Sequence, residues 1–179
     1  YSTVYCNGVY TYYDTYRPKC TRHGHSGNID VITAIKWSCN IFFYDVGRRT
    51  TSDVYDAYAY KMGLGVRTGV EVNEATGRLT TKKDSNYIAS LDVQAAIGQG
   101  NTVVTPVQLA TYAGTLANRG VRYRTHFVKA ILDTNTGEVI HETQPEVMDV
   151  VEDNGTTFAL VRQGMKLGPS TITGKISSY

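Results

Sequence analysis

The chain has 179 residues, enough for one domain with a sizeable hydrophobic core. Its composition is 41% hydrophobic and 19% charged, which excludes an intrinsically disordered chain. A formal net charge of +2 without any Lys/Arg-rich run gives no basis for nucleic-acid binding. No stretch approaches the roughly 18 apolar residues of a membrane span, and no signal peptide is visible.

The first 27 residues are rich in Tyr, Thr and Gly and lack helical periodicity, which predicts short extended pieces and loops. Four of the 14 tyrosines cluster here, and aromatic rings of this kind either pack within a loop or stack on sugar rings. We favour packing. The four are Tyr10, Tyr12, Tyr13 and Tyr16.

The cysteines and two of the histidines offer no sequence signature of a metal site. There are three cysteines (Cys6, Cys20 and Cys39), an odd number without a CxxC pair, which argues against zinc. Cys6 and Cys20 flank a stretch that could fold back on itself, so a disulfide and free thiols both stay open. His23 and His25 have no carboxylate or Cys at ligand spacing, and we expect solvated or locally hydrogen-bonded loop histidines. Neither a metal nor a cofactor is expected.

The first helical pattern follows this segment. Asn28 or Asp30 can cap a helix over residues 31–35, and Ser38-Cys39-Asn40 interrupts it. A longer pattern then runs from residue 41 to about residue 62. Gly47 and residues 50–53 mark a break inside the longer helix, with Ser52 or Asp53 as the cap that would restart it.

The second half of the chain mixes turns, helices and a hairpin. Residues 66–90 are mostly turn-forming and polar. Thr105, Pro106 and Gln108 then combine a cap, a first-turn proline and a capping box, and Asn118 and Gly120 end that helix.

A β-hairpin is predicted from residue 121 to residue 141, with its turn at residues 133–137. Asp153 or Asn154 can cap a last helix that includes Phe158 and Met165. Helices and a hairpin without regular strand–helix alternation favour an α+β fold.

Ser38-Cys39-Asn40 is the sharpest candidate for chemistry. A hydroxyl and an amide two residues apart, at a break between helices, can point into one cleft, where the hydroxyl relays a proton and the amide holds a peptide group. The pattern alone is not specific, since Ser26-Gly27-Asn28 also matches it.

The surroundings of Ser38 resemble a known family. Residues 34–44 are similar to the second active-site motif of penicillin-binding proteins with its flanking helices, and further blocks follow in the family's order over about residues 20–165. These blocks are His23–Asp30, Met62-Gly63-Leu64-Gly65, Thr68-Gly69-Val70-Glu71, Ile97-Gly98-Gln99-Gly100, Thr105–Ala110, Ala117–Gly120 and Gly164-Met165. The resemblance implies that residues 1–179 form part of a transpeptidase domain of the penicillin-binding-protein and serine β-lactamase type, with a helical part and a β-hairpin. The block from Gly98 to Pro106 resembles transpeptidases rather than β-lactamases.

The resemblance also implies a function. It is that of a peptidoglycan D,D-transpeptidase that cross-links stem peptides ending in D-Ala-D-Ala through a serine acyl-enzyme, and that β-lactams acylate. Ser38 would take part in catalytic proton transfer, and Asn40 would hydrogen-bond the substrate or the antibiotic. The parent protein, of class B by the character of its Tyr- and Cys-containing lead-in, would be membrane-anchored with this domain on the extracytoplasmic face. It would work with the cell-wall synthesis machinery that sets cell shape, and would bear on antibiotic resistance.

Two motifs of the family pattern are missing from the sequence. No Ser is followed by Lys three positions on, and Gly174-Lys175-Ile176-Ser177 fails the Lys-Thr-Gly pattern. We expect a truncated part of an active enzyme, inactive by itself. The alternative is a non-catalytic relative that binds or senses peptidoglycan or β-lactams.

Overall fold

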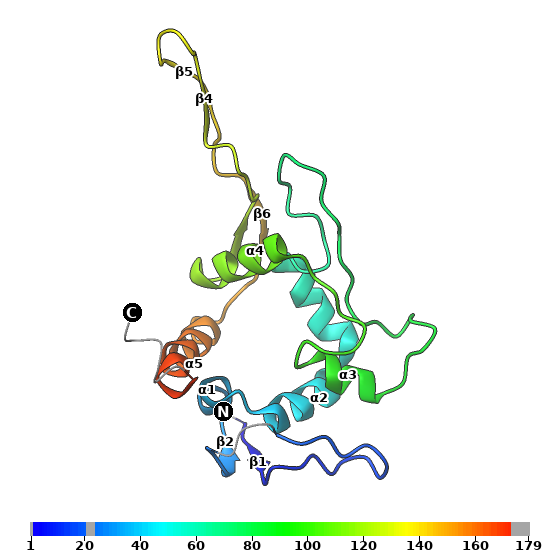
Figure 1. Cartoon of the computed structure of the whole chain (residues 1–179). Coiled ribbons are helices and arrows are strands. Elements are labelled where there is room, and N and C mark those ends of the chain that lie inside the picture. The colour runs from blue at the N-terminus through cyan, green and yellow to red at the C-terminus, as the bar shows by residue number, and fades with distance from the viewer. Residues whose placement is uncertain (1, 21–23, 173–179) are drawn as a thin grey trace. The chain divides into compact units, whose positions relative to one another are not determined.

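In the computed structural model, residues 2–20 and 24–172 are described, and Figure 1 shows their helices and strands. These residues divide into two compact units. The first unit contains the described residues up to 56 together with 80–102 and 153–172, and the second contains residues 57–79 and 103–152. Helices and small two-stranded sheets are mixed in them, so the expected α+β class is confirmed. Within the described ranges, no helix combines the length and apolar character that crossing a bilayer requires.

The N-terminal part of the first unit is mostly irregular, as its composition predicts. Strand β1 (Val4–Cys6) pairs antiparallel with β2 (Gly27–Ile29), with Tyr5 opposite Asn28. Between them, the Tyr-rich stretch folds back, and the Tyr10 N–H donates to the Pro18 carbonyl at 2.9 Å.

Two consecutive helices follow, and both begin where the sequence predicts. Helix α1 (Val31–Trp37) is capped by Asp30, whose carboxylate accepts from the Thr33 N–H at 2.8 Å. Helix α2 (Asn40–Lys61) has a kink at Thr51, where the backbone leaves the helical region with φ 59° and ψ 166°.

The predicted break in α2 is confirmed, but its predicted cap is wrong. The Ser52 N–H, which the kink deprives of a helical acceptor, donates instead to Asp92 Oδ1 at 3.2 Å. Asp92 belongs to α3 (Ser90–Ala95), a six-residue helix that the sequence does not reveal. Because this cap comes from a residue 40 positions away, no local pattern predicts it.

Asp56 lies close to the same carboxylate. It is buried, and desolvation, followed by the negative charges of Asp92, Asp53 and Asp84, raises the pKa of Asp56 to about 6. The carboxyl of Asp56 is therefore more easily protonated in the folded chain than in the unfolded one.

The last helix, α5 (Thr157–Ile172), packs against α1. It starts as predicted, with the Asp153 carboxylate accepting from the Thr157 N–H at 2.9 Å and the Phe158 N–H at 3.3 Å. Gly164 allows the close approach, because a Cβ there would lie 2.8 Å from Ile35 Cβ.

In the second unit, α4 (Pro106–Ala117) shows the predicted capping box between Thr105 and Gln108. The Gln108 side chain is fully buried. Its Nε2 donates to the carbonyls of Val66 and Thr76 at 2.6 and 2.7 Å, and its Oε1 accepts from the Thr105 N–H at 3.0 Å. One buried amide therefore holds the 66–76 segment against the start of α4.

The 66–76 segment has its own anchor at Glu74. The Glu74 carboxylate accepts from the Thr68 N–H, the Thr68 hydroxyl and the Gly69 N–H at 2.8–2.9 Å. Desolvation works to raise the pKa of Glu74, but these hydrogen bonds outweigh it, and the pKa is lowered. Glu74 therefore favours the folded segment most in its ionised form.

The predicted hairpin is confirmed. Strand β4 (Ala130–Leu132) pairs antiparallel with β5 (Val139–Glu142). Strand β3 (Val121–Tyr123) pairs with β6 (Val147–Val150), a strand that was not predicted, and Figure 1 shows the hairpin continuing beyond this pair.

Candidate functional site

Ser38 ends α1 in the left-handed conformation, with φ 53° and ψ 51°. Its N–H donates to the Ile35 carbonyl at 3.2 Å, and the Cys39 N–H donates to the Ala34 carbonyl at 2.9 Å. This is the double hydrogen bond of a Schellman motif, which usually has Gly at the left-handed position. Ser38 adopts a backbone conformation that is unfavourable for residues other than Gly, which is consistent with a functional role for its side chain.

The three residues of the motif have different surroundings. Ser38 is exposed, Cys39 is fully buried and Asn40 is half-buried at the first position of α2. The Asn40 Nδ2 lies 3.4 Å from the Lys19 carbonyl, a long hydrogen bond that a ligand can replace. The junction thus presents a hydroxyl and an amide while the residue between them anchors the turn in the core.

The other match, Ser26-Gly27-Asn28, is placed differently. Gly27 and Asn28 are part of β2, where Gly27 pairs with Cys6 and Asn28 pairs with Tyr5. This match belongs to a sheet rather than to a helix junction. The structure therefore separates two sequence matches that looked alike.

The two missing motifs leave the site incomplete within the chain. Ser-x-x-Lys is absent from the sequence. The nearest approach to Lys-Thr-Gly, residues 174–177, lies outside the described residues. The sequence thus contains one of the three motifs of the family pattern.

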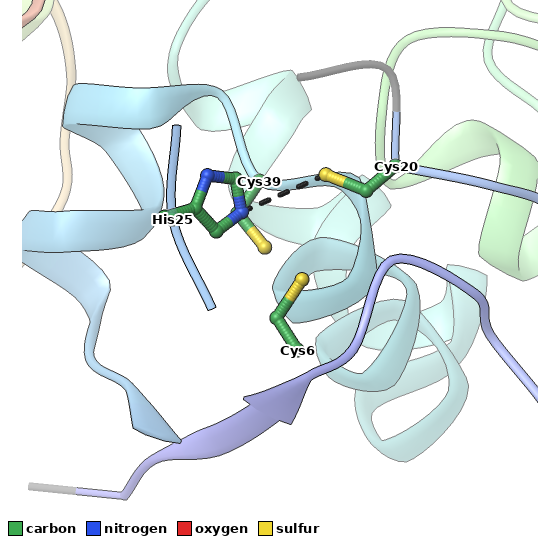
Figure 2. Close-up of side chains that lie close together, drawn as sticks. All are labelled: Cys6, Cys20, His25 and Cys39. Atoms are coloured by element: carbon green, nitrogen blue, oxygen red, sulfur yellow. Dashed lines mark hydrogen bonds between the residues drawn. The ribbon is translucent and has the colours of Figure 1, made fainter. Parts of the chain in front are cut away.

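The three cysteines come together beneath the junction. All three are free, buried thiols, and Cys20 Sγ lies 3.6 Å from His25 Nε2. The ligand atoms of Cys6, Cys20, His25 and Cys39 all lie within 4.8 Å of one another. Figure 2 shows the three sulfur atoms and the imidazole pointing toward a common centre.

Sequence spacing gave no sign of this cluster, because its members come from four separate segments. His25 is predicted to be solvated or locally hydrogen-bonded, and the structure places its Nε2 among three cysteine sulfurs; His23 lies outside the described residues. Burial raises the pKa of Cys39 to about 12, and the neighbouring Cys6 thiol adds to this against the opposing Phe42 backbone N–H. Three thiols and an imidazole are a ligand set for a tetrahedral metal ion such as Zn²⁺.

Three of the four clustered tyrosines pack in or against the core, as predicted. Tyr10 is buried in the core of the first unit, and Tyr13 and Tyr16 pack against that core. Tyr12 stays exposed, with the Arg48 guanidinium 4.2 Å from its ring centroid. Tyr10, Tyr13 and Tyr16 therefore belong to the packing of the core, and Tyr12 lies outside it.

Comparison with known proteins agrees with the family resemblance that the sequence motifs indicate. The sequence model of the family described as "Penicillin binding protein transpeptidase domain" matches residues 1–178. Penicillin-binding protein 2A of Bacillus subtilis is 30% identical over 175 residues, which are 85% of this chain and 24% of that protein. Peptidoglycan D,D-transpeptidase MrdA of Salmonella typhimurium is 26% identical over 151 residues, or 79% of this chain and 24% of that protein.

Solved structures of similar proteins also share the fold of this chain. A chain from a structure titled "Structural coordination of polymerization and crosslinking by a peptidoglycan synthase complex" has a TM-score of 0.81 and 27% identity over 98% of this chain and 30% of its own. Penicillin-binding protein 2B of Streptococcus pneumoniae (strain 5204) has a TM-score of 0.65 and 28% identity over 78% of this chain and 26% of its own. The present chain thus spans about a quarter of the length of the curated relatives named above.

Proposed function

Because the chain belongs to the penicillin-binding protein transpeptidase domain family, we propose that it is part of a D,D-transpeptidase that cross-links peptidoglycan stem peptides. The observation that carries this is the helix junction. It presents an exposed Ser38 hydroxyl and a half-buried Asn40 amide, held in place by Cys39 in the core. The character of the relatives favours a parent protein of class B.

The reaction is an acyl transfer in two steps. A serine hydroxyl that this chain does not supply attacks the carbonyl between two D-Ala residues, the C–N bond breaks, and the terminal D-Ala leaves with a proton. An amine of a second stem peptide then attacks the ester, forms the cross-link and returns the serine hydroxyl. A β-lactam carbonyl takes the place of the peptide in the first step.

Ser38 and Asn40 have separate tasks in this scheme. The exposed Ser38 hydroxyl relays the proton to the leaving amine, since a hydroxyl both donates and accepts. The Asn40 side chain exchanges its long contact with the Lys19 carbonyl for a hydrogen bond to the substrate or to the antibiotic's side-chain amide.

The setting of the protein follows from the substrate. Peptidoglycan stem peptides are cross-linked outside the cytoplasm, so we place this domain on the extracytoplasmic face of the cell membrane, in a membrane-anchored parent. A relative of the chain is part of a peptidoglycan synthase complex, which supports cell-wall synthesis proteins as partners.

Labelling with a fluorescent penicillin tests the proposal. We expect a form extended in both directions along the gene to be labelled covalently, and the 179-residue chain not to be labelled. Covalent labelling of the 179-residue chain would contradict the inference that this chain does not supply the attacking serine. If a folded extended form were not labelled, the proposal that the protein is a transpeptidase would be contradicted.

The second candidate function is that of a non-catalytic binding module. The observation that favours it is that neither Ser-x-x-Lys nor Lys-Thr-Gly occurs in this sequence. Such a module would hold peptidoglycan or a β-lactam without acylation. Equilibrium binding of a penicillin to the extended form, reversible on dilution and without a covalent mass increase, would establish this reading.

A further inference from the structure

We propose that β4 is a self-association edge, through which two copies of this chain pair antiparallel and join their hairpins into one continuous sheet. β4 and β5 form a two-stranded ribbon at the outer end of the hairpin (Figure 1). Within the part of the chain that the structure describes, β4 pairs with β5 alone, so its other edge has no strand beside it. Such an edge carries unpaired backbone groups that a further strand can satisfy.

The backbone of β4 turns the N–H and C=O groups of Ala130 and Leu132 toward this open edge. The Lys129 carbonyl accepts from the Thr143 N–H at 2.9 Å, so the backbone groups of Lys129 face β5. The Asp133 N–H likewise donates to the returning side of the hairpin, at 2.8 Å. Because the backbone groups of successive residues point to opposite sides of a strand, Ala130 and Leu132 direct theirs outward.

Glu71 closes the same edge of the hairpin just before β4. Its carboxylate accepts from the Phe127 N–H at 3.0 Å and from the Val128 N–H at 3.3 Å. The edge is thus covered as far as Val128, and the open stretch runs from residue 129 to the turn that begins at residue 133. A partner strand can therefore pair only along β4 and the residues directly beside it.

One register of two β4 strands matches every pair of neighbouring side chains. A two-fold axis at Ile131 places Lys129 of each copy opposite Asp133 of the other, and Ala130 opposite Leu132. Each Ala130–Leu132 pair exchanges both of its N–H···O bonds across the seam. Ile131 and Leu132, which are 51% and 52% exposed, lose contact with water. The turn holds Asp133 through Oδ1, at 2.8 and 2.9 Å, which leaves Oδ2 to receive the Lys129 ammonium.

The β5 edge offers no register that is equally well matched. A two-fold axis at His141 would place the two His141 side chains together and Ile140 opposite Glu142 of the second copy. An axis at Ile140 would place Glu138 opposite Glu142, and an axis at Glu142 would place the two Glu142 carboxylates together. Like charges directly opposite each other destabilise a sheet. Opposite charges on either side of the centre of β4 therefore favour a second copy of this chain as the partner of β4.

Intermolecular disulfide formation tests the register of the seam directly. Ile131 meets its own copy at a position without backbone hydrogen bonds, where Cα atoms lie about 4.5 Å apart, within reach of a disulfide. The cysteines already present in the chain are buried. We expect the 179-residue chain with Ile131→Cys to form a disulfide-linked dimer under mild oxidation. Ile140→Cys, at a more exposed position of β5, should cross-link about tenfold less.

Sedimentation velocity over a range of protein concentrations measures the strength of the association. Ala130→Pro removes an outward N–H that the β4–β5 ladder does not use, and Lys129→Glu places like charges opposite each other at both ends of the seam. We expect each substitution to weaken dimerisation by about tenfold or more. Glu142→Lys, a charge change of equal size on β5, should leave dimerisation unchanged.

Two results would overturn the proposal. A wild-type chain that stays monomeric at every concentration would leave the β4 edge to a strand of a different protein. Dimers that survive both Ala130→Pro and Lys129→Glu, with equal cross-linking of Ile131→Cys and Ile140→Cys, would show association through another surface. The cysteine variants keep the test decisive if Ala130→Pro fails to fold. Self-association does not rest on the proposed function, and neither result bears on penicillin labelling.

Discussion

Gln108→Glu isolates the contribution of one buried amide to the second unit. The substitution keeps the shape of the side chain but replaces the Nε2 group, which donates to the carbonyls of Val66 and Thr76, with an acceptor. A protonated carboxyl has one O–H for two carbonyls, so one hydrogen bond is lost. An ionised carboxylate has none and places a charge in a fully buried site.

The expected loss depends on pH. The unmatched carbonyl costs about 1–3 kcal/mol at every pH. Burial raises the pKa of the introduced carboxyl above its unfolded value of about 4.3. The deficit in unfolding free energy is therefore smallest below about pH 4 and grows by about 1.4 kcal/mol per pH unit above it, until the folded pKa is reached. At pH 7 it approaches about 5 kcal/mol.

Urea unfolding followed by far-UV circular dichroism, from pH 4 to pH 8, measures this deficit. Gln108→Met is the matched control, because it removes the same hydrogen bonds without adding a titratable group. Gln144→Glu, at an exposed site, should change little. If the deficits of Gln108→Glu and Gln108→Met ran parallel across the pH range, Gln108 would not be buried against the two carbonyls.

Three further substitutions test other contacts. Asp56→Asn should raise the unfolding free energy by up to about 3 kcal/mol at pH 8 and leave it unchanged near pH 3. The reason is that the destabilising effect of the Asp56 carboxylate on the folded state develops as pH rises from about 4 to about 6. Equal effects at both pH values would refute the raised pKa of Asp56. Gly164→Val should lower thermal stability by separating α5 from Ile35, with Gly168→Val, where added carbon meets nothing, as the comparison; equal losses would contradict the helix packing. Glu74→Gln should speed amide exchange at residues 68–69 at pH 7, and this difference should fade as pH falls through the lowered pKa of Glu74; exchange unchanged at pH 7 would remove the anchoring role.

Features that depend on neighbouring residues could be predicted from the sequence. Asp30 and Thr33, or Thr105 and Gln108, are three positions apart, so the caps of α1 and α4 are visible in the sequence. The β4–β5 hairpin is visible for the same reason, because its turn joins the two strands directly.

Features made by distant residues could not be predicted. The Asp92 cap of Ser52 and the β3–β6 pairing join segments more than 20 residues apart, and a six-residue helix such as α3 has too little periodicity to detect. The cysteine cluster is the clearest case, because its four members share no local motif.

The roles of Ser38 and Asn40 remain predictions that family resemblance and geometry support. Their difference from Ser26 and Asn28, which match the same pattern at the start of strand β2, emerges only from the fold. That difference also supplies the control for the decisive measurement.

The rate constant for acylation of the extended protein by a fluorescent penicillin tests the central claim most directly. We expect Ser38→Ala to lower it by about 10²-fold or more, as loss of a proton relay does, while Ser26→Ala leaves it unchanged. Ser38→Gly, which suits the left-handed backbone, should be as slow as Ser38→Ala. If Ser38→Gly acylated at the wild-type rate, the Ser38 hydroxyl would have no part in the reaction and the assignment of the site would be wrong.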